Sequence, residues 1–159
     1  MEAMGVDLGI FLETKLMGGI YTRNSSGYSV FVSNAPSAHQ GGIAFFWRAN
    51  KTYEVKDWRI RGPNVLSFVI VTGSQRFYIV ECYILPTNLN TLPQVKQALN
   101  ECPKGHTPLL IGDLNIKFRT PRDERDERIT EVAEDVCGLT NLFKHFRQQS
   151  RGHTQGRWT

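Results

Sequence analysis

Apolar and polar positions alternate in short segments along the first two thirds of the chain. Runs of β-branched and aromatic residues are separated by Gly, Pro, Asn and Ser, which is the pattern of strands joined by turns. Residues 52–60 alternate apolar and polar side chains, as a half-exposed strand does. We therefore predict strands at 6–12, 28–32, 42–47 and 52–60, with a polar loop at 33–41.

The clearest local element is a hairpin in the middle of the chain. Residues 65–71 and 76–85 are rich in Val, Ile and Phe, and the Gly-containing segment 72–75 joins them. Pro86 follows the second strand, where a residue without an N–H cannot continue a sheet ladder. The pattern thus predicts two antiparallel strands that end at Pro86.

Helical spacing appears after the hairpin. Apolar residues recur at helical intervals over 92–99, and a short apolar strand follows at 107–111, ended by Gly112. The same intervals predict a helix over 123–146 that Gly138 divides. Strands that come first, with helices between and after them, predict an α/β (or α+β) fold with mixed sheets.

The composition is that of one folded domain. The chain has 159 residues, of which 40% are hydrophobic and 21% charged, and this excludes an intrinsically disordered protein. No apolar run approaches the ~20 residues of a membrane helix, and the start lacks the basic region of a secretory signal. We expect an intracellular protein, in which a nuclear location is plausible, without a membrane partner. Cys82, Cys102 and Cys137 are scattered, which favours reduced thiols over disulfides or a zinc site.

The charge balance permits an anionic partner such as nucleic acid without establishing one. The formal net charge is +4, but much of the basic charge alternates with acid, as in 122–128, which we expect to be a solvated helix face. Between Arg48 and Arg61, basic residues outnumber acidic ones. This stretch is either a phosphate-facing surface or the basic edge of a sheet, which discourages pairing with other strands.

Four polar residues stand where chemistry could occur. Glu13 and Asp113 each follow an apolar strand, and carboxylates at strand ends can bind a hard cation or move a proton. In Gly112–Asn115 the glycine leaves room for a ligand, and an extended chain would direct Asp113 and Asn115 to the same side. Tyr83, on the same strand face as Glu81, could donate to a phosphoryl oxygen. The alternatives are turn-capping carboxylates, an Asp/Asn turn and a half-buried strand aromatic.

These residues also carry a resemblance to a known family. The chain resembles the endonuclease/exonuclease/phosphatase superfamily, and within it the apurinic-endonuclease-like domains of non-LTR retrotransposons. The resemblance runs over nearly the whole chain. The segments that carry it, in order, are Phe11–Leu16 (FLETKL), Gly41–Ala44 (GGIA), Tyr83–Pro86 (YILP) and Leu109–Asn115 (LLIGDLN).

The resemblance implies a fold, an activity and residue roles. The fold would be a partial four-layer α/β sandwich with mixed sheets flanked by helices. The activity would be Mg²⁺-dependent hydrolysis of phosphodiesters in DNA, with Mn²⁺ as a possible substitute. Glu13 would bind the metal ion, Tyr83 would contact the scissile phosphate, Asp113 would handle a proton, and Asn115 would steady the phosphate. A reverse transcriptase of the same element is a possible partner.

The chain also departs from this family. Members begin with a strand that carries an Asn and end with a Ser-Asp-His strand, and neither is present in 1–159. Leu12 stands where many members have Gln, and Asn141 where many have Asp. We therefore expect a single, incomplete domain over 1–159, poorly soluble or partly unfolded in isolation and impaired as a catalyst. The alternatives are a phosphatase of the same superfamily, acting on inositol phosphates or a sphingolipid, and a non-catalytic remnant or nucleic-acid-binding module.

Overall fold

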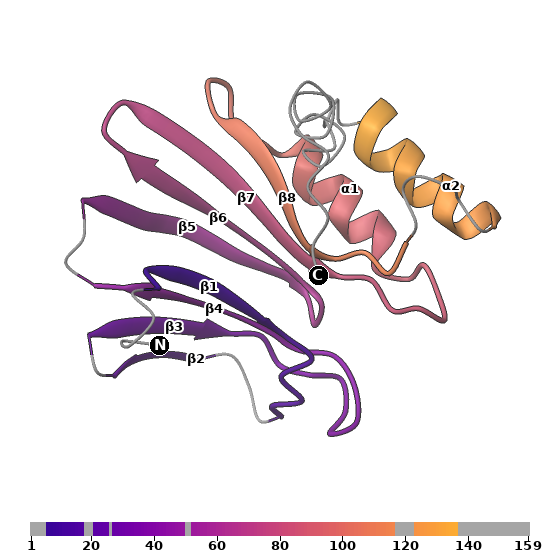
Figure 1. Cartoon of the computed structure of the whole chain (residues 1–159), viewed down its shortest axis with the longest axis horizontal. Helices are drawn as coiled ribbons and strands as arrows, with labels where there is room; N and C mark the ends of the chain where they lie inside the picture. Colours follow the sequence, from indigo (N-terminus) through magenta and orange to yellow (C-terminus); the bar gives the residue numbers. More distant parts are fainter. Residues whose placement is uncertain (1–5, 18–20, 26, 50–51, 117–122, 137–159) are drawn as a thin grey trace, which may run out of the picture.

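Two four-stranded sheets packed face to face form the centre of the protein (Figure 1). The computed structural model describes residues 6–17, 21–25, 27–49, 52–116 and 123–136. Every strand and helix expected within these ranges is present, and the boundaries that fall within them are shifted by at most two residues.

The first sheet is antiparallel throughout. It contains β1 (Leu8–Leu12), β2 (Tyr21–Ser25), β3 (Tyr28–Val32) and β4 (Ile43–Arg48) in the spatial order β1-β4-β3-β2. The strand β2 was not predicted, because its sequence YTRNS has no apolar alternation. It forms by pairing with β3 along its full length, so tertiary pairing overrides a weak local preference.

The second sheet is mixed, as expected. It contains β5 (Tyr53–Gly62), β6 (Val65–Thr72), β7 (Gln75–Tyr83) and β8 (Thr107–Asp113) in sequential order. β6 and β7 form the predicted hairpin, while β7 and β8 are parallel and are connected through α1 (Leu92–Asn100). Parallel strands require such a crossover, because the end of one strand and the start of the next lie at opposite ends of the sheet.

The last described segment is helical. The helix α2 (Glu124–Glu131) begins after Asp123, whose side chain accepts a hydrogen bond of 3.0 Å from the Asp126 N–H. A short π-helical segment, η2 (Val132–Val136), continues it, and the expected division at Gly138 falls outside the described residues. The expected solvated face is wrong in one respect: Asp126 is fully buried and the Arg125 side chain is mostly buried.

Two apolar cores hold the layers together. One core lies between the sheets and the other between the second sheet and both helices. In the inter-sheet core, the rings of Phe45 and Phe68 stack with centroids 4.1 Å apart. The helix-facing core includes residues of β6 and β7, the residue that follows β7 and residues of both helices: Val65, Val69, Val80, Ile84, Val95, Leu99 and Ile129.

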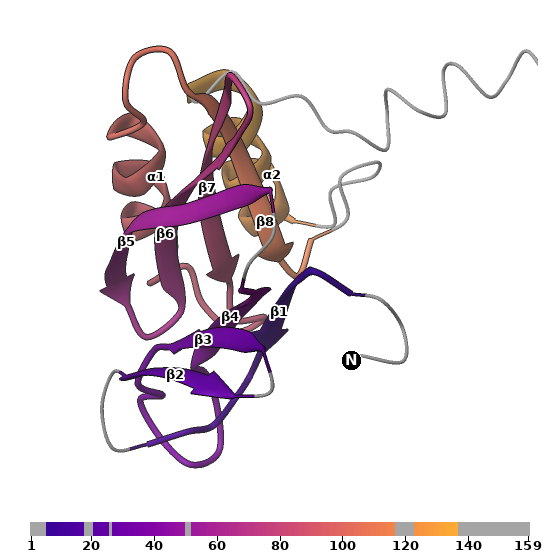
Figure 2. The same ribbon diagram turned by 90° about the vertical axis from the view of Figure 1, so that its left-hand side faces the viewer.

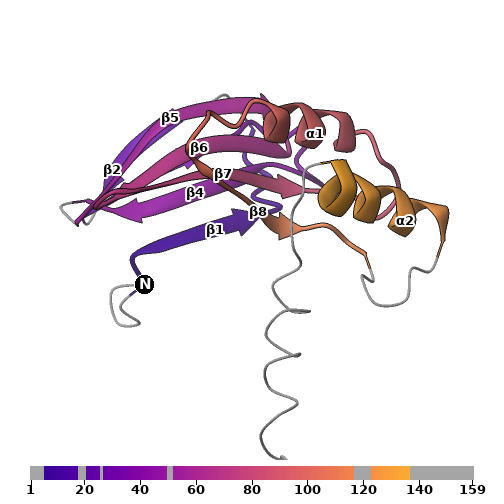
Figure 3. The ribbon, with the colours of Figure 1, turned by 90° about the horizontal axis from the view of Figure 1, so that it is seen from above.

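The helices cover one outer face of the molecule. Figures 2 and 3 show α1 and α2 together beyond the second sheet, so the described part of this partial sandwich has three layers. The α/β class is confirmed, since two sheets and their helices form a layered sandwich. Within the described ranges, no helix has the length and apolar character needed to span a membrane.

Candidate active site

The Glu13 side chain is carried by a loop that leaves β1. Glu13 and Lys15 both have left-handed backbone conformations, with φ of 53° and 56°. The loop lies on Gly41 and Gly42, whose carbonyl oxygens accept hydrogen bonds from the Lys15 and Thr14 N–H groups at 3.0 and 3.1 Å. A Cβ atom at Gly42 would lie 2.4 Å from Thr14 Oγ1, so glycine is needed for this close packing.

Tyr83 joins the second sheet to this loop. It is the last residue of β7, its side chain faces the inter-sheet core, and it is 6% exposed. Its hydroxyl donates a hydrogen bond to Glu13 Oε1. The contact brings together two residues 70 positions apart, one from each sheet.

The pKa of Tyr83 is raised to about 12 by its surroundings. Burial is the largest cause, followed by the hydrogen bond with Glu13 and by the negative charges of Glu13 and Asp113. A hydrogen bond with the Asn115 side chain acts in the opposite direction. Tyr83 is therefore a neutral phenol at physiological pH and can act as a hydrogen-bond donor.

Asp113 and Asn115 complete the group. Asp113 lies opposite Tyr83 in the β7–β8 register, and its carbonyl oxygen accepts a hydrogen bond of 2.9 Å from the Ile84 N–H. Asn115 donates through Nδ2 to the Ile84 carbonyl oxygen at 3.0 Å. The structure thus brings all four candidate residues to the same ends of β7 and β8, beside the Glu13 loop.

The local geometry of Asp113 and Asn115 differs from the expected extended chain. Asn115 has a φ of 52°, and its N–H donates to Asp113 Oδ1 at 2.8 Å, which is the Asp/Asn turn named above as the alternative. Gly112 does not leave room for a ligand: a Cβ atom there would lie 1.9 Å from the Cys82 carbonyl oxygen. This glycine allows β8 to approach the backbone of β7.

Asn64 is a site residue that the sequence analysis missed. It is buried between β5 and β6, where its Oδ1 accepts a hydrogen bond of 3.1 Å from the Gly42 N–H. Its carbonyl oxygen accepts one of 3.0 Å from the Tyr83 N–H. Asn64 therefore links Gly42, on which the Glu13 loop lies, to the end of β7. In the sequence it looks like an ordinary turn residue after Pro63.

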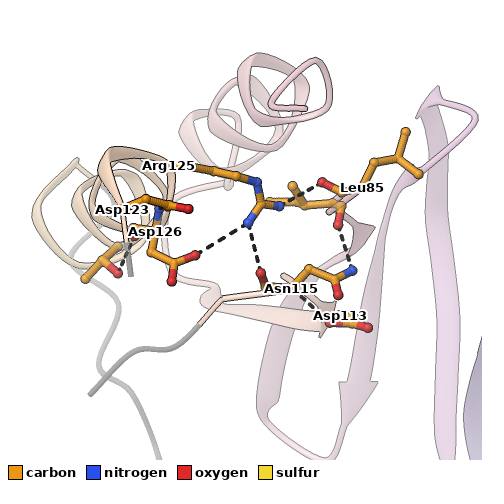
Figure 4. Close-up of polar contacts among 8 residues, drawn as sticks. Leu85, Asp113, Asn115, Asp123, Arg125 and Asp126 are labelled. Atoms are coloured by element: carbon orange, nitrogen blue, oxygen red, sulfur yellow. Dashed lines mark hydrogen bonds and ion pairs between the residues drawn. The ribbon is translucent and has the colours of Figure 1, made fainter. Parts of the chain in front are cut away.

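Arg125 is a second missed residue, and it reaches the site from α2 (Figure 4). Its Nη1 donates to the Asn115 carbonyl oxygen at 2.9 Å and its Nη2 to the Leu85 carbonyl oxygen at 2.7 Å. The position of Arg125 inside a run of mixed charges concealed this role, since such runs usually face solvent.

Glu81 is a buried carboxyl on the same strand face as Tyr83, as expected. Neither of its carboxyl oxygens has a hydrogen-bond partner in the described part of the chain. Burial raises the pKa of Glu81 from 4.5 to about 8. The carboxyl is therefore mainly protonated at neutral pH.

Glu13 is suited to hold a metal ion. Its side chain is 42% exposed, with Oε1 bonded to Tyr83 and Oε2 3.9 Å from Lys15 Nζ. Across the described residues, no three His, Cys, Asp or Glu side chains group as a metal site would require. Mg²⁺ needs only one or two carboxylates when water and phosphate supply its other ligands, so the donor set fits Mg²⁺ and not a closed structural site.

An apolar hollow of about 450 Å³ adjoins the other side of Glu13. It is on the outer face of the first sheet, and its apolar side chains include Phe11, Val30, Val32 and Ala44. An apolar lining does not suit an anionic ligand, so this hollow is not a candidate site for one.

The basic stretch between Arg48 and Arg61 lies elsewhere, and its described cations are paired with acids. Arg48 Nε lies 3.4 Å from Asp7 Oδ1, and Lys56 Nζ lies 3.5 Å from Glu54 Oε2. Arg59 and Arg61 both contact Glu101. Because β5 is also the edge strand of its sheet, these contacts favour the basic edge over the phosphate-facing surface.

Comparisons with known proteins support the fold. No family model matches the chain, and no curated protein matches it. A solved structure described as the endonuclease domain of TRAS1, a telomere-specific non-LTR retrotransposon, superposes with a TM-score of 0.61 at 19% sequence identity. The match covers 85% of this chain and 62% of that domain, so the chain spans about three fifths of its length. The similarity shows a shared endonuclease-like fold.

Proposed function

We propose that this chain carries the active site of a Mg²⁺-dependent phosphodiester hydrolase, a DNA endonuclease of the retrotransposon type. The observation that carries this proposal is the contact between Tyr83 and Glu13 beside Asp113 and Asn115. A metal-binding carboxylate, a neutral donor, a proton acceptor and an amide together meet the needs of phosphodiester hydrolysis. The shared fold with a retrotransposon endonuclease domain supports the choice of DNA.

Each side chain has one task in this proposal. Asp113 accepts a proton from the attacking water or delivers one to the leaving group. The Asn115 amide, anchored by its bond to the Ile84 carbonyl oxygen, donates to a phosphoryl oxygen. Tyr83 has a single proton, so it must release Glu13 before it can donate to the phosphate.

Glu13 is the residue that would hold Mg²⁺. When bound, the ion supplies positive charge at the phosphate and lowers the pKa of a coordinated water. Lys15 Nζ lies 3.9 Å from the Glu13 carboxylate.

The experiment is a nicking assay on supercoiled plasmid DNA, with and without Mg²⁺. Asp113→Asn and Glu13→Gln keep the shape of each side chain but remove its charge, and we expect each to lower the nicking rate by about 100-fold or more. Glu54→Gln is the matched control, because Glu54 is an exposed carboxylate on the far edge strand β5. Its rate should equal that of the wild type.

Three results would overturn the proposal. The first is equal nicking by the wild type and both site variants. The second is activity that does not depend on a divalent ion. The third is phosphate release from a phosphomonoester without cleavage of DNA, which would instead support a phosphatase on the same fold.

A further inference from the structure

We propose that Arg125 is a positioning residue of this site. It acts as a clamp, because it bonds the chain segments that follow β7 and β8. In this way it holds Asn115 in the left-handed backbone conformation that turns the Asn115 amide toward Tyr83. The kinetic consequences of this inference rest on the proposed function, whereas its structural consequences do not.

The clamp is formed by a single guanidinium group. Nη1 bonds the Asn115 carbonyl oxygen at 2.9 Å, and Nη2 bonds the Leu85 carbonyl oxygen at 2.7 Å (Figure 4). The Arg125 side chain is only 16% exposed, and Nη1 also lies 3.5 Å from the carboxylate of the buried Asp126. Hydrogen bonds in such a buried, poorly solvated environment are strong, and their loss is costly.

The two carbonyl groups occupy equivalent positions after the strands β7 and β8. Leu85 is two residues beyond Tyr83, and Asn115 is two residues beyond Asp113. Arg125 thus holds both chain segments immediately after their site residues, without touching the candidate catalytic groups themselves. If it is removed, the bonds between Ile84, Asp113 and Asn115 remain to join the two strand ends.

Asn115 depends on this support because a left-handed backbone is a minor conformation even for asparagine, which adopts it more readily than most residues other than glycine. Its φ of 52° is held on one side by the N–H bond to Asp113 Oδ1 and on the other by the bond from Arg125 to its carbonyl oxygen. A relaxed backbone would rotate the side chain away from Tyr83. A misplacement of about 1 Å is enough to cost on the order of 100-fold in rate.

The helix makes the clamp rigid. Arg125 lies in the first turn of α2, which the Asp123 cap fixes at its start. Ile129, one turn later, is buried in the helix-facing core. Since the guanidinium is a planar fork whose two nitrogens each bond one carbonyl, lysine is not equivalent: its single terminal nitrogen cannot present the same two-point geometry.

The first test is kinetic and uses the full chain. Arg125→Lys should lower kcat for plasmid nicking by about 10- to 100-fold with little change in KM, because substrate is still bound but Asn115 is misaligned. Arg128→Lys is the matched control, an exposed arginine on the same helix. In an Asn115→Gly background, which keeps the left-handed backbone but lacks the amide, Arg125→Lys should add almost nothing. Additive losses would overturn the proposal.

The second test does not need activity. Hydrogen exchange at the Asn115 N–H, which is bonded to Asp113 Oδ1, should become about tenfold faster in Arg125→Lys, while protection in β6 and α1 stays at the wild-type level. Unchanged exchange at Asn115 would overturn the clamp whatever the nicking rates are. Faster exchange in a protein whose wild type does not nick DNA would support the clamp and refute the proposed function.

Discussion

At the scale of residues, the candidate site depends on which side chains keep their protons. Burial holds Tyr83 and Glu81 protonated on the inner face of β7, with pKa values of about 12 and about 8. Glu13 and Asp113, by contrast, lie where solvent reaches them. The inner face of β7 is therefore mainly uncharged at neutral pH, and the exposed carboxyl groups of the candidate site lie at the ends of the strands.

The protonation of Glu81 predicts a pH dependence of stability. Its pKa rises from 4.5 to about 8 on folding, so between these values the folded chain binds more protons than the unfolded chain. The free energy of unfolding should therefore fall as the pH rises through this window, with a slope that approaches about 1.4 kcal/mol per pH unit. Urea denaturation at several pH values measures this slope.

The matched substitutions are Glu81→Gln and Glu54→Gln. Glutamine cannot ionise, so Glu81→Gln should remove most of the loss of stability toward pH 8, while the exposed Glu54→Gln should behave as the wild type. Parallel pH profiles for all three proteins would show that Glu81 does not carry the effect.

Residue types in the sequence predicted four residues of the candidate site and missed two that support it. Glu13, Tyr83, Asp113 and Asn115 could be proposed because each ends or follows an apolar strand. Arg125 and Asn64 could not, because they contact backbone carbonyl and N–H groups that no sequence pattern places. A side chain that binds backbone can be recognised only after the fold is known.

At the scale of elements, the parallel pairing of β7 with β8 brings Tyr83 beside Asp113. This pairing depends on Gly112, the residue where β8 comes against the Cys82 carbonyl. Periodicity predicted both strands but no pairing between them, since nothing in either sequence states which strand lies next to which. The same limit explains why β2 was not predicted, because only its pairing with β3 identifies it as a strand.

A methyl group at Gly112 should separate the two strands. Its Cβ atom would overlap the Cys82 carbonyl oxygen at 1.9 Å, and the residue has a φ of 131° that other residues rarely adopt. We expect Gly112→Ala to lower the free energy of unfolding by about 3 kcal/mol or more, as measured by urea denaturation.

The control for this prediction is Gly105→Ala. Gly105 also has a positive φ, of 78°, but has open space around its Cα, so the change should cost only about 1 kcal/mol. Equal losses in the two variants would contradict the close approach of β8 to β7 at Gly112.

At the scale of the whole molecule, the candidate site exists only because two sheets meet. Glu13 comes from the first sheet and the other three residues from the second, and Asn64 links the two. The α/β class could be predicted from the order of the elements. The layering could not, because helices were expected on more faces of the two sheets than the described residues show. The shared fold with a retrotransposon endonuclease domain agrees with this arrangement.

The most direct test of the central claim is paramagnetic broadening of backbone NMR signals by substoichiometric Mn²⁺, which can replace Mg²⁺ at oxygen sites. We predict that the signals of Glu13, Tyr83 and Asp113 broaden first and together, that excess Mg²⁺ restores them, and that Glu13→Gln abolishes the effect. Broadening that is spread over unrelated surface carboxylates, or that persists in Glu13→Gln, would contradict a single metal and phosphate site at the junction of the two sheets.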